Sequence, residues 1–138
     1  MRKRTYAREF ALQILYQIDI TEDDTEAVLE NFWQNKIDEK IDPSIKDFTD
    51  RIVRGVVGNL DKINAKITQY AKNWQLKRMA VVDRNILRLA SFELLFCQDI
   101  PPKVTINEAV ELSKKFSGIE TAKFVNGILD KIKLEINK

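Results

Sequence analysis

The stretch from Val81 to Cys97 constrains the fold most, because it is apolar on almost every side when it is wound as a helix. It contains no glycine or proline, and its hydrophobic residues cover nearly the whole circumference at 3.6 residues per turn. Arg84, Arg88 and Ser91 form one narrow polar stripe. A helix of this kind is too short and too charged to span a bilayer. We expect it at the centre of a globular domain, with the arginine stripe at the surface.

The rest of the chain shows helical spacing of apolar residues and no alternation typical of strands. The sequence therefore predicts an all-α fold of about seven helices in a single domain over residues 1–138. Besides the central helix, the spacing places helices close to residues 6–18, 25–33, 43–60, 63–70, 105–116 and 120–136.

Local signals mark the helix ends. Asp42 followed by Pro43 is typical of an N-cap and a first helical residue, and residues 23–25 offer caps for the second helix. Pro101 and Pro102 are expected to end the central helix. Thr105 with Glu108 three residues later fits a capping box.

Several side chains are assigned to the interior by the pattern. Trp33 is expected in the core, and Trp74 with Leu76 is expected to pack onto it from the connector at 71–79. Gly55 is expected to allow close helix approach. Glu93 is the one acid on an otherwise apolar face, so a cation or a backbone cap should satisfy it.

Composition excludes most enzyme classes. The chain has no histidine and only Cys97, which rules out histidine-based nucleophile pairs and a structural zinc site. No glycine-rich phosphate-binding motif occurs. We therefore expect no catalytic residue, metal or other cofactor. The apolar runs are too short for a membrane helix or a signal peptide, which predicts a cytoplasmic protein without membrane contact.

Charge is gathered at the N-terminus, where Arg2, Lys3, Arg4 and Arg8 lie within the first eight residues. Cations at a helix N-terminus oppose its dipole by about 0.3–1 kcal/mol each, so they do not help the fold. Binding of an external anion explains them better. The alternative is a disordered basic tail.

Four segments carry a resemblance that covers essentially the whole chain. They are residues 7–16 (Ala-Arg-Glu-x-Ala-x-Gln-x-Leu-Tyr), 82–90 (Val-Asp-Arg-Asn-Ile-Leu-Arg-Leu-Ala), 104–112 (Val-Thr-Ile-Asn-Glu-Ala-Val-Glu-Leu) and 123–130 (Lys-Phe-Val-Asn-Gly-Ile-Leu-Asp). Together they resemble the NusB family of transcription antitermination factors. The resemblance implies two small helical bundles packed across each other.

The resemblance also implies a function. Members bind single-stranded boxA RNA of ribosomal RNA leaders together with the ribosomal protein NusE, and they join an antitermination complex on RNA polymerase. A related domain is fused to RNA cytosine methyltransferases, but no sequence follows Lys138 here, so we expect the free-standing factor. A homodimer is possible in this family. The alternative is a helical protein-interaction scaffold or ribosome-biogenesis adaptor with incidental RNA contact.

The resemblance assigns residues to two surfaces. The RNA-binding residues implied are Arg2, Lys3, Arg4, Arg8, Glu120, Thr121, Lys123 and Phe124. The partner-binding residues implied are Tyr16, Asp83, Arg84 and Arg88. Glu120 suits acceptance of a hydrogen bond from a base amine rather than contact with phosphate. For Phe124 base stacking and core packing stay open, as do interface and core edge for Tyr16.

Overall fold

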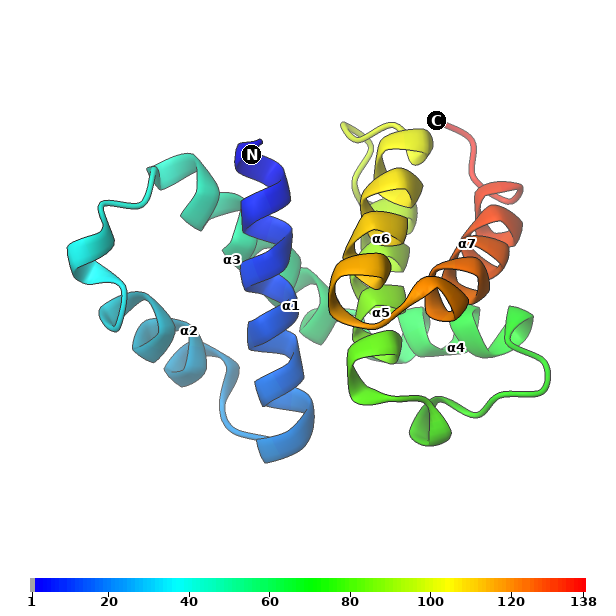
Figure 1. The fold of residues 1–138 in the computed structure, drawn as a ribbon, viewed down its shortest axis with the longest axis horizontal. Helices are drawn as coiled ribbons and strands as arrows, with labels where there is room; N and C mark the ends of the chain where they lie inside the picture. The colour runs from blue at the N-terminus through cyan, green and yellow to red at the C-terminus, as the bar shows by residue number, and fades with distance from the viewer. Residues whose placement is uncertain (1) are drawn as a thin grey trace.

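The computed structural model describes residues 2–138, which form seven α-helices and two short 3₁₀ helices (Figure 1). In chain order they are α1 (Lys3–Thr21), α2 (Thr25–Gln34), η1 (Ile37–Glu39), α3 (Pro43–Gly58), α4 (Leu60–Tyr70), η2 (Leu76–Arg78), α5 (Val81–Phe96), α6 (Pro102–Phe116) and α7 (Ile119–Lys133). No strand occurs within these residues, so the all-α prediction is confirmed. None of the described helices is both long and apolar enough to cross a membrane.

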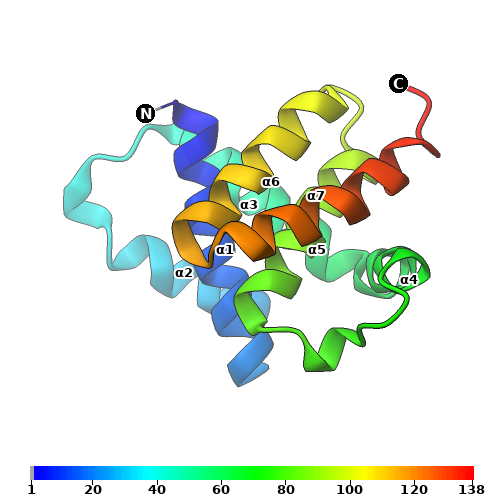
Figure 2. The same cartoon turned by 45° about the vertical axis from the view of Figure 1, so that its right-hand side comes forward.

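The helices form two groups, which Figure 1 shows side by side, whereas they overlap in the turned view of Figure 2. Helices α1, α2 and α3 pack on one another, and α4 to α7 form the second group around α5. The α5 helix also packs against α1 and α3, so it belongs to both groups. The buried apolar side chains of the two groups form one continuous core.

The central position of α5 is confirmed. Ile86, Leu87 and Leu94 are completely buried. Gly55 of α3 lets α5 approach closely, because a Cβ atom there would lie 2.1 Å from the ring of Phe92. A side chain at position 55 would therefore force the ring of Phe92 to move.

The helix starts follow the sequence at two places and depart from it at a third. The carboxylates of Asp24 and Asp42 cap α2 and α3 by accepting hydrogen bonds from the backbone N–H groups of Ala27 and Ser44. The capping box at Thr105 is wrong, because α6 already begins at Pro102. Proline suits the first turn of a helix, where its missing N–H costs nothing.

The predicted position of the arginine stripe is wrong. The side chains of Arg84 and Arg88 are only 15% and 12% exposed, and Ser91 is completely buried. The stripe faces α1 instead of water, where the carboxylate of Asp19 accepts hydrogen bonds from both guanidinium groups. A polar stripe can lie inside a fold when a neighbouring helix supplies the opposite charge.

The two tryptophans occupy different environments. Trp33 is half-buried, and its indole Nε1 donates a 2.8 Å hydrogen bond to Asp50. Trp74 is 55% exposed, so its predicted place in the core is wrong, while Leu76 does pack against the core.

Candidate nucleic-acid interface

The basic N-terminal side chains gather around one surface hollow of about 500 Å³. It lies between the start of α1 and the segment that joins α5 to α6, and it is lined by Arg2, Lys3, Arg4, Arg8, Asp99, Ile100, Pro101, Val104 and Glu108. The fold thus brings all four predicted N-terminal basic residues together, and it also places the acids Asp99 and Glu108 in the lining of the same hollow.

Arg8 does not have the exposed position that the sequence predicted. Its side chain is 2% exposed, and its guanidinium donates two hydrogen bonds of 2.7 and 2.9 Å to Glu93. A third bond of 3.2 Å goes to Glu108. The predicted inward role of Glu93 is confirmed, with Arg8 as its cation and Thr105 as a further donor at 2.8 Å. A guanidinium held in this way has no accessible face for a phosphate.

Lys3 and Arg4 are held much more loosely. Lys3 pairs with Asp42 at 2.9 Å, and its side chain is 66% exposed. Arg4 lies 3.8 Å from Asp99 and 4.2 Å from the centre of the Phe48 ring, with half of its side chain exposed. Exposed pairs of this kind contribute about 0–1 kcal/mol, so an incoming phosphate can replace the carboxylates at little cost.

The start of α7 presents the second predicted group. The side chains of Glu120 and Lys123 are 92% and 73% exposed and lie 3.9 Å apart. Phe124 is half-buried, with part of its ring on the core. Gly118 provides no side-chain cap, so backbone N–H groups of the first turn stay open to an acceptor.

A hydrogen bond joins this segment to α5. Thr121 Oγ1 donates to Asp83 Oδ2 at 3.2 Å, and it also lies 2.9 Å from the hydroxyl of Ser117. Within the described residues the other carboxylate oxygen of Asp83 is buried without a hydrogen-bond partner. One predicted RNA-binding residue and one predicted partner-binding residue are therefore direct neighbours.

The other predicted partner-binding residues surround Asp19 of α1. Asp19 accepts hydrogen bonds of 2.7–2.9 Å from Arg84, Arg88 and Asn85. Burial raises the pKa of the Asp19 carboxyl, but the hydrogen bonds from Arg84 and Asn85 and the two guanidinium charges outweigh it, and the pKa is lowered. Tyr16 lies one helical turn before Asp19 and is 41% exposed, at the edge of this network.

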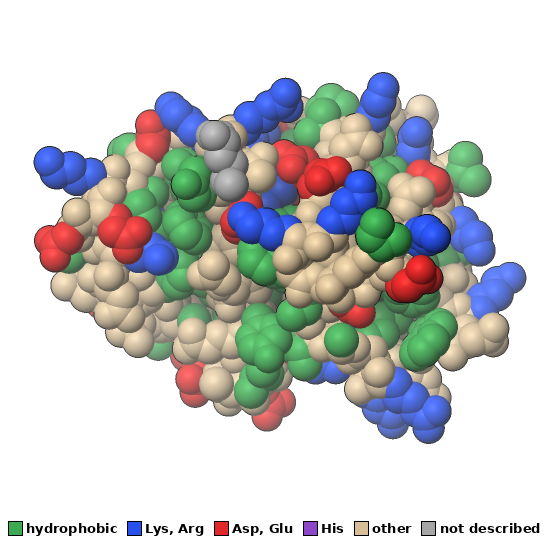
Figure 3. Space-filling model, in the orientation of Figure 1, with side chains coloured by type: hydrophobic (Ala, Val, Ile, Leu, Met, Phe, Trp, Pro, Cys, Tyr) green, Lys and Arg blue, Asp and Glu red, His purple; other side chains and the backbone are tan. Residues whose placement is uncertain are grey.

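The two predicted RNA-binding segments lie on different helices, α1 and α7. The last turn of α6 lies between them, where Lys115 donates a 2.9 Å hydrogen bond to Glu9 of α1. Figure 3 shows basic side chains along the upper and right-hand edges of this face, with hydrophobic groups among them. The sequence did not single out Lys115 or Asp19, because the hydrogen-bond partner of each lies more than 60 positions away in the chain.

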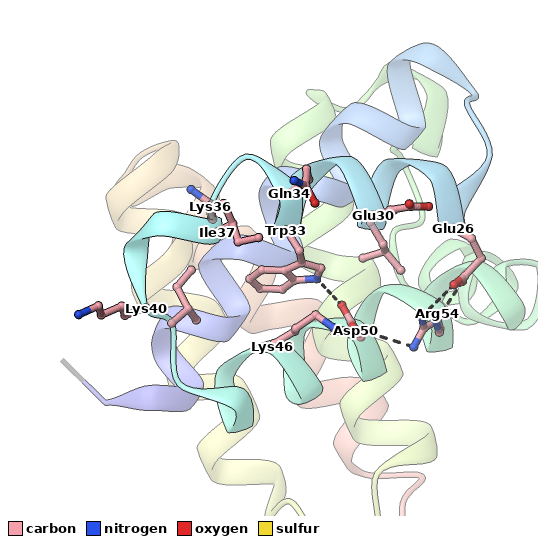
Figure 4. Close-up of a pocket in the computed structure, with 12 residues that line it drawn as sticks. Glu26, Glu30, Trp33, Gln34, Lys36, Ile37, Lys40, Lys46, Asp50 and Arg54 are labelled. Carbon is pink, nitrogen blue, oxygen red and sulfur yellow. Dashed lines mark hydrogen bonds and ion pairs between the residues drawn. The ribbon is translucent and has the colours of Figure 1, made fainter.

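Another hollow, of about 580 Å³, lies between α2, η1 and α3 (Figure 4). Trp33 and Asp50 form part of its wall, and Lys46 and Arg54 lie 3.9–4.0 Å from the Asp50 carboxylate. None of the predicted site residues lines it. In the described part of the chain no three His, Cys, Asp or Glu side chains converge to hold a metal ion.

Comparison with known proteins points to one family. A family model described as the NusB family matches residues 5–133. The transcription antitermination protein NusB of Myxococcus xanthus (strain DK1622) is 44% identical, with 100% of this chain and 99% of that protein covered. Its counterpart in Thermodesulfovibrio yellowstonii is 41% identical, with 96% and 93% covered.

Solved structures give the same result. The structure of T. maritima NusB superposes with a TM-score of 0.87 at 41% identity, covering 98% of this chain and 93% of that one. A structure of the antitermination factors NusB and NusE in complex with dsRNA superposes with a TM-score of 0.86 at 27% identity, covering 97% and 98%. On sequence, fold and the four matching segments, the chain belongs to the NusB family.

Proposed function

We propose that this protein is a non-catalytic antitermination factor that binds boxA-type RNA together with a NusE-type ribosomal protein. Its relatives carry the name of transcription antitermination proteins, and a structural neighbour is bound to NusE and RNA. The observation that carries the proposal is the hydrogen bond between Thr121 and Asp83, because it makes a proposed RNA-binding residue and a proposed partner-binding residue direct neighbours.

The RNA path that we propose begins at Arg2, Lys3 and Arg4 and ends at the start of α7. Lys115 lies between the two ends and can supply a further phosphate contact after release of Glu9. Arg8 is left out of the direct contacts, because its guanidinium is buried against Glu93. Arg8 instead fixes the first turns of α1 against α5, so that the exposed basic side chains of α1 are held in position.

The partner surface that we propose includes Tyr16, Asp83 and Arg84. Tyr16 offers an exposed aromatic ring. Asp83 Oδ1 is buried and accepts no hydrogen bond within the described residues, so a partner would reach it only after a local side-chain shift. Arg88 is mostly buried, so it supports this surface through Asp19. Assembly with RNA polymerase and self-association belong to the same proposal, and both would use or cover this surface.

Binding of a short labelled boxA-type RNA tests the proposal, with and without the ribosomal protein. Affinity should fall with salt, with a slope of about −0.7 for each phosphate contacted on a single strand. Charge reversal by Lys123→Glu should weaken binding to all sequences and reduce the slope by about one such contact. Lys131→Glu, near the other end of α7, is the matched control and should leave binding unchanged.

Two results would reject the proposal. One is equal binding of the parent and of a variant with both Arg4→Glu and Lys3→Glu. The other is an RNA affinity that does not change when the ribosomal protein is added, since a shared surface must respond to both partners. The same titrations with duplex RNA separate single-strand recognition from the double-stranded RNA contact of the structural neighbour.

A further inference from the structure

Trp74 does not pack in the core, although it has the largest side chain of the connector between α4 and α5. Its side chain is 55% exposed, and its ring contacts the ring of Phe124 with 6.1 Å between centroids and 68° between planes. Leu76 fills the place on the core that the sequence had assigned to both residues. The indole is therefore held at the surface against an aromatic residue of the predicted RNA-binding segment.

The setting of this aromatic pair is cationic. Residues 71–82 contain Lys72, Lys77 and Arg78 and no acid, and Lys123 directly precedes Phe124. Lys72, Lys77, Arg78 and Lys123 are all exposed. Figure 3 shows basic side chains at the lower right, where Figure 1 places this connector.

The connector is fixed in position, so the pair is a defined surface. The backbone N–H of Trp74 donates a 2.9 Å hydrogen bond to Ala71, and η2 follows directly. Arg84 Nη1 donates to the carbonyl of Leu76 at 3.3 Å, which ties the connector to the Asp19 network. Phe124 in turn belongs to α7, three residues after the Thr121–Asp83 bond.

We propose that Trp74 and Phe124 together form a stacking platform for an unpaired base of the bound RNA. Single-stranded nucleic acid is recognised by aromatic rings that stack bases, beside cations that contact the backbone. This inference rests on the proposed function and extends it, because it adds the connector at residues 71–80 to the RNA-binding surface. It also extends the proposed RNA path from the start of α7 to the connector.

RNA suits this surface better than a protein partner does. The centres of protein interfaces contain few charged residues, and lysine in particular is depleted there. Here three exposed cations lie on the same connector as Trp74, and Lys123, which lies 3.9 Å from Glu120, directly precedes Phe124. An unpaired base with its phosphate matches both parts, whereas a protein would have to bury these lysines.

The fluorescence of Trp74 provides a direct test. In the variant Trp33→Phe, Trp74 is the only indole, and a boxA-type single-stranded RNA should quench its emission as the RNA binds. In Trp74→Phe the remaining Trp33 lies in the hollow beside α2 and should not respond. Anisotropy of a labelled RNA measures binding independently in every variant.

Affinities of two substitutions separate stacking from folding. Trp74→Ala should weaken binding at least about 5-fold, whereas Trp74→Phe keeps an aromatic ring and should stay close to the parent. Trp33→Phe is the matched control for loss of an indole. Circular dichroism and thermal melting should show the same fold for the two Trp74 variants, because Trp74 is exposed.

The outcomes distinguish this inference from the function on which it rests. RNA binding without quenching of Trp74, and with normal affinity of Trp74→Ala, would overturn the platform and leave the proposed function intact. Quenching by the ribosomal protein alone, and not by RNA, would overturn it in favour of a protein contact. If the parent binds no RNA even with the ribosomal protein, the proposed function itself fails.

Discussion

Two ionic networks join α1 to α5, and they differ in depth. At the start of α1 the guanidinium of Arg8 and the carboxylate of Glu93 are 2% and 0% exposed. Near its end Asp19, Arg84 and Arg88 keep 12–15% of their side chains exposed. The buried pair can serve only the fold, because nothing outside reaches it. The second network lies beside Tyr16 and Asp83, where an incoming partner can contact its rim.

The largest effect is expected at the buried network. Glu93→Gln removes the buried counter-ion of Arg8 and leaves Glu108 as its acidic partner, so the free energy of unfolding should fall by up to about 3–5 kcal/mol. Denaturant unfolding measures this loss. The paired variant Arg8→Met with Glu93→Leu removes both charges, and it should be more stable than Glu93→Gln. A loss below about 1 kcal/mol for Glu93→Gln would contradict the buried pair.

A smaller loss is expected at the second network. Asp19→Asn removes the carboxylate that accepts from Arg84, Arg88 and Asn85, and about 1–3 kcal/mol of stability should disappear. Partial exposure moderates the effect, since water can solvate the two guanidinium groups. Asp47→Asn, an exposed aspartate of α3, serves as the control and should change stability little. Equal melting of both variants would show that this network does not stabilise the protein.

The same residue predicts a dependence on pH. The folded protein lowers the pKa of Asp19 below its ordinary value of 3.8, so its contribution is complete above that pH. The contribution is lost as the pH falls below 3.8 through the folded pKa. Between neutral pH and pH 2, the free energy of unfolding should therefore fall more steeply with decreasing pH for the parent than for Asp19→Asn. Parallel curves would contradict this.

The smallest effect is expected at an exposed pair. Arg51 donates hydrogen bonds of 3.0 and 2.6 Å to Asp99, and they lower the pKa of that carboxyl to about 2. Asp99→Asn should cost at most about 1 kcal/mol near neutral pH, because both side chains face water. The difference from the parent should vanish as the pH falls from 3.8 to about 2. Thermal melting at several pH values checks this.

Local features were predictable from the sequence because neighbours along the chain produce them. The periodicity of the central helix, the caps at Asp24 and Asp42 and the absence of strands in residues 2–138 depend on residues within one or two turns. The buried position of Cys97 follows in the same way from its place in an apolar run.

Predictions failed where a distant residue decided the environment. Thr105 and Glu108 look like a capping box, but inside α6 they contact Glu93 and Arg8 instead. Trp74 looks like a core residue, yet Leu76 takes that place. In both cases the local pattern allows two arrangements, and packing of the helices selects one.

The sequence by itself determined the helices and the position of α5, because apolar spacing and local caps act over a few residues. The family followed from the resemblance of four segments. The tertiary structure alone decided which arginines face outward. Arg8, Arg84 and Arg88 resemble the exposed bases in sequence, but burial forces each of them to pair with an acid from another helix. Charges in the interior must be paired, and only the packed fold shows which partner lies within reach.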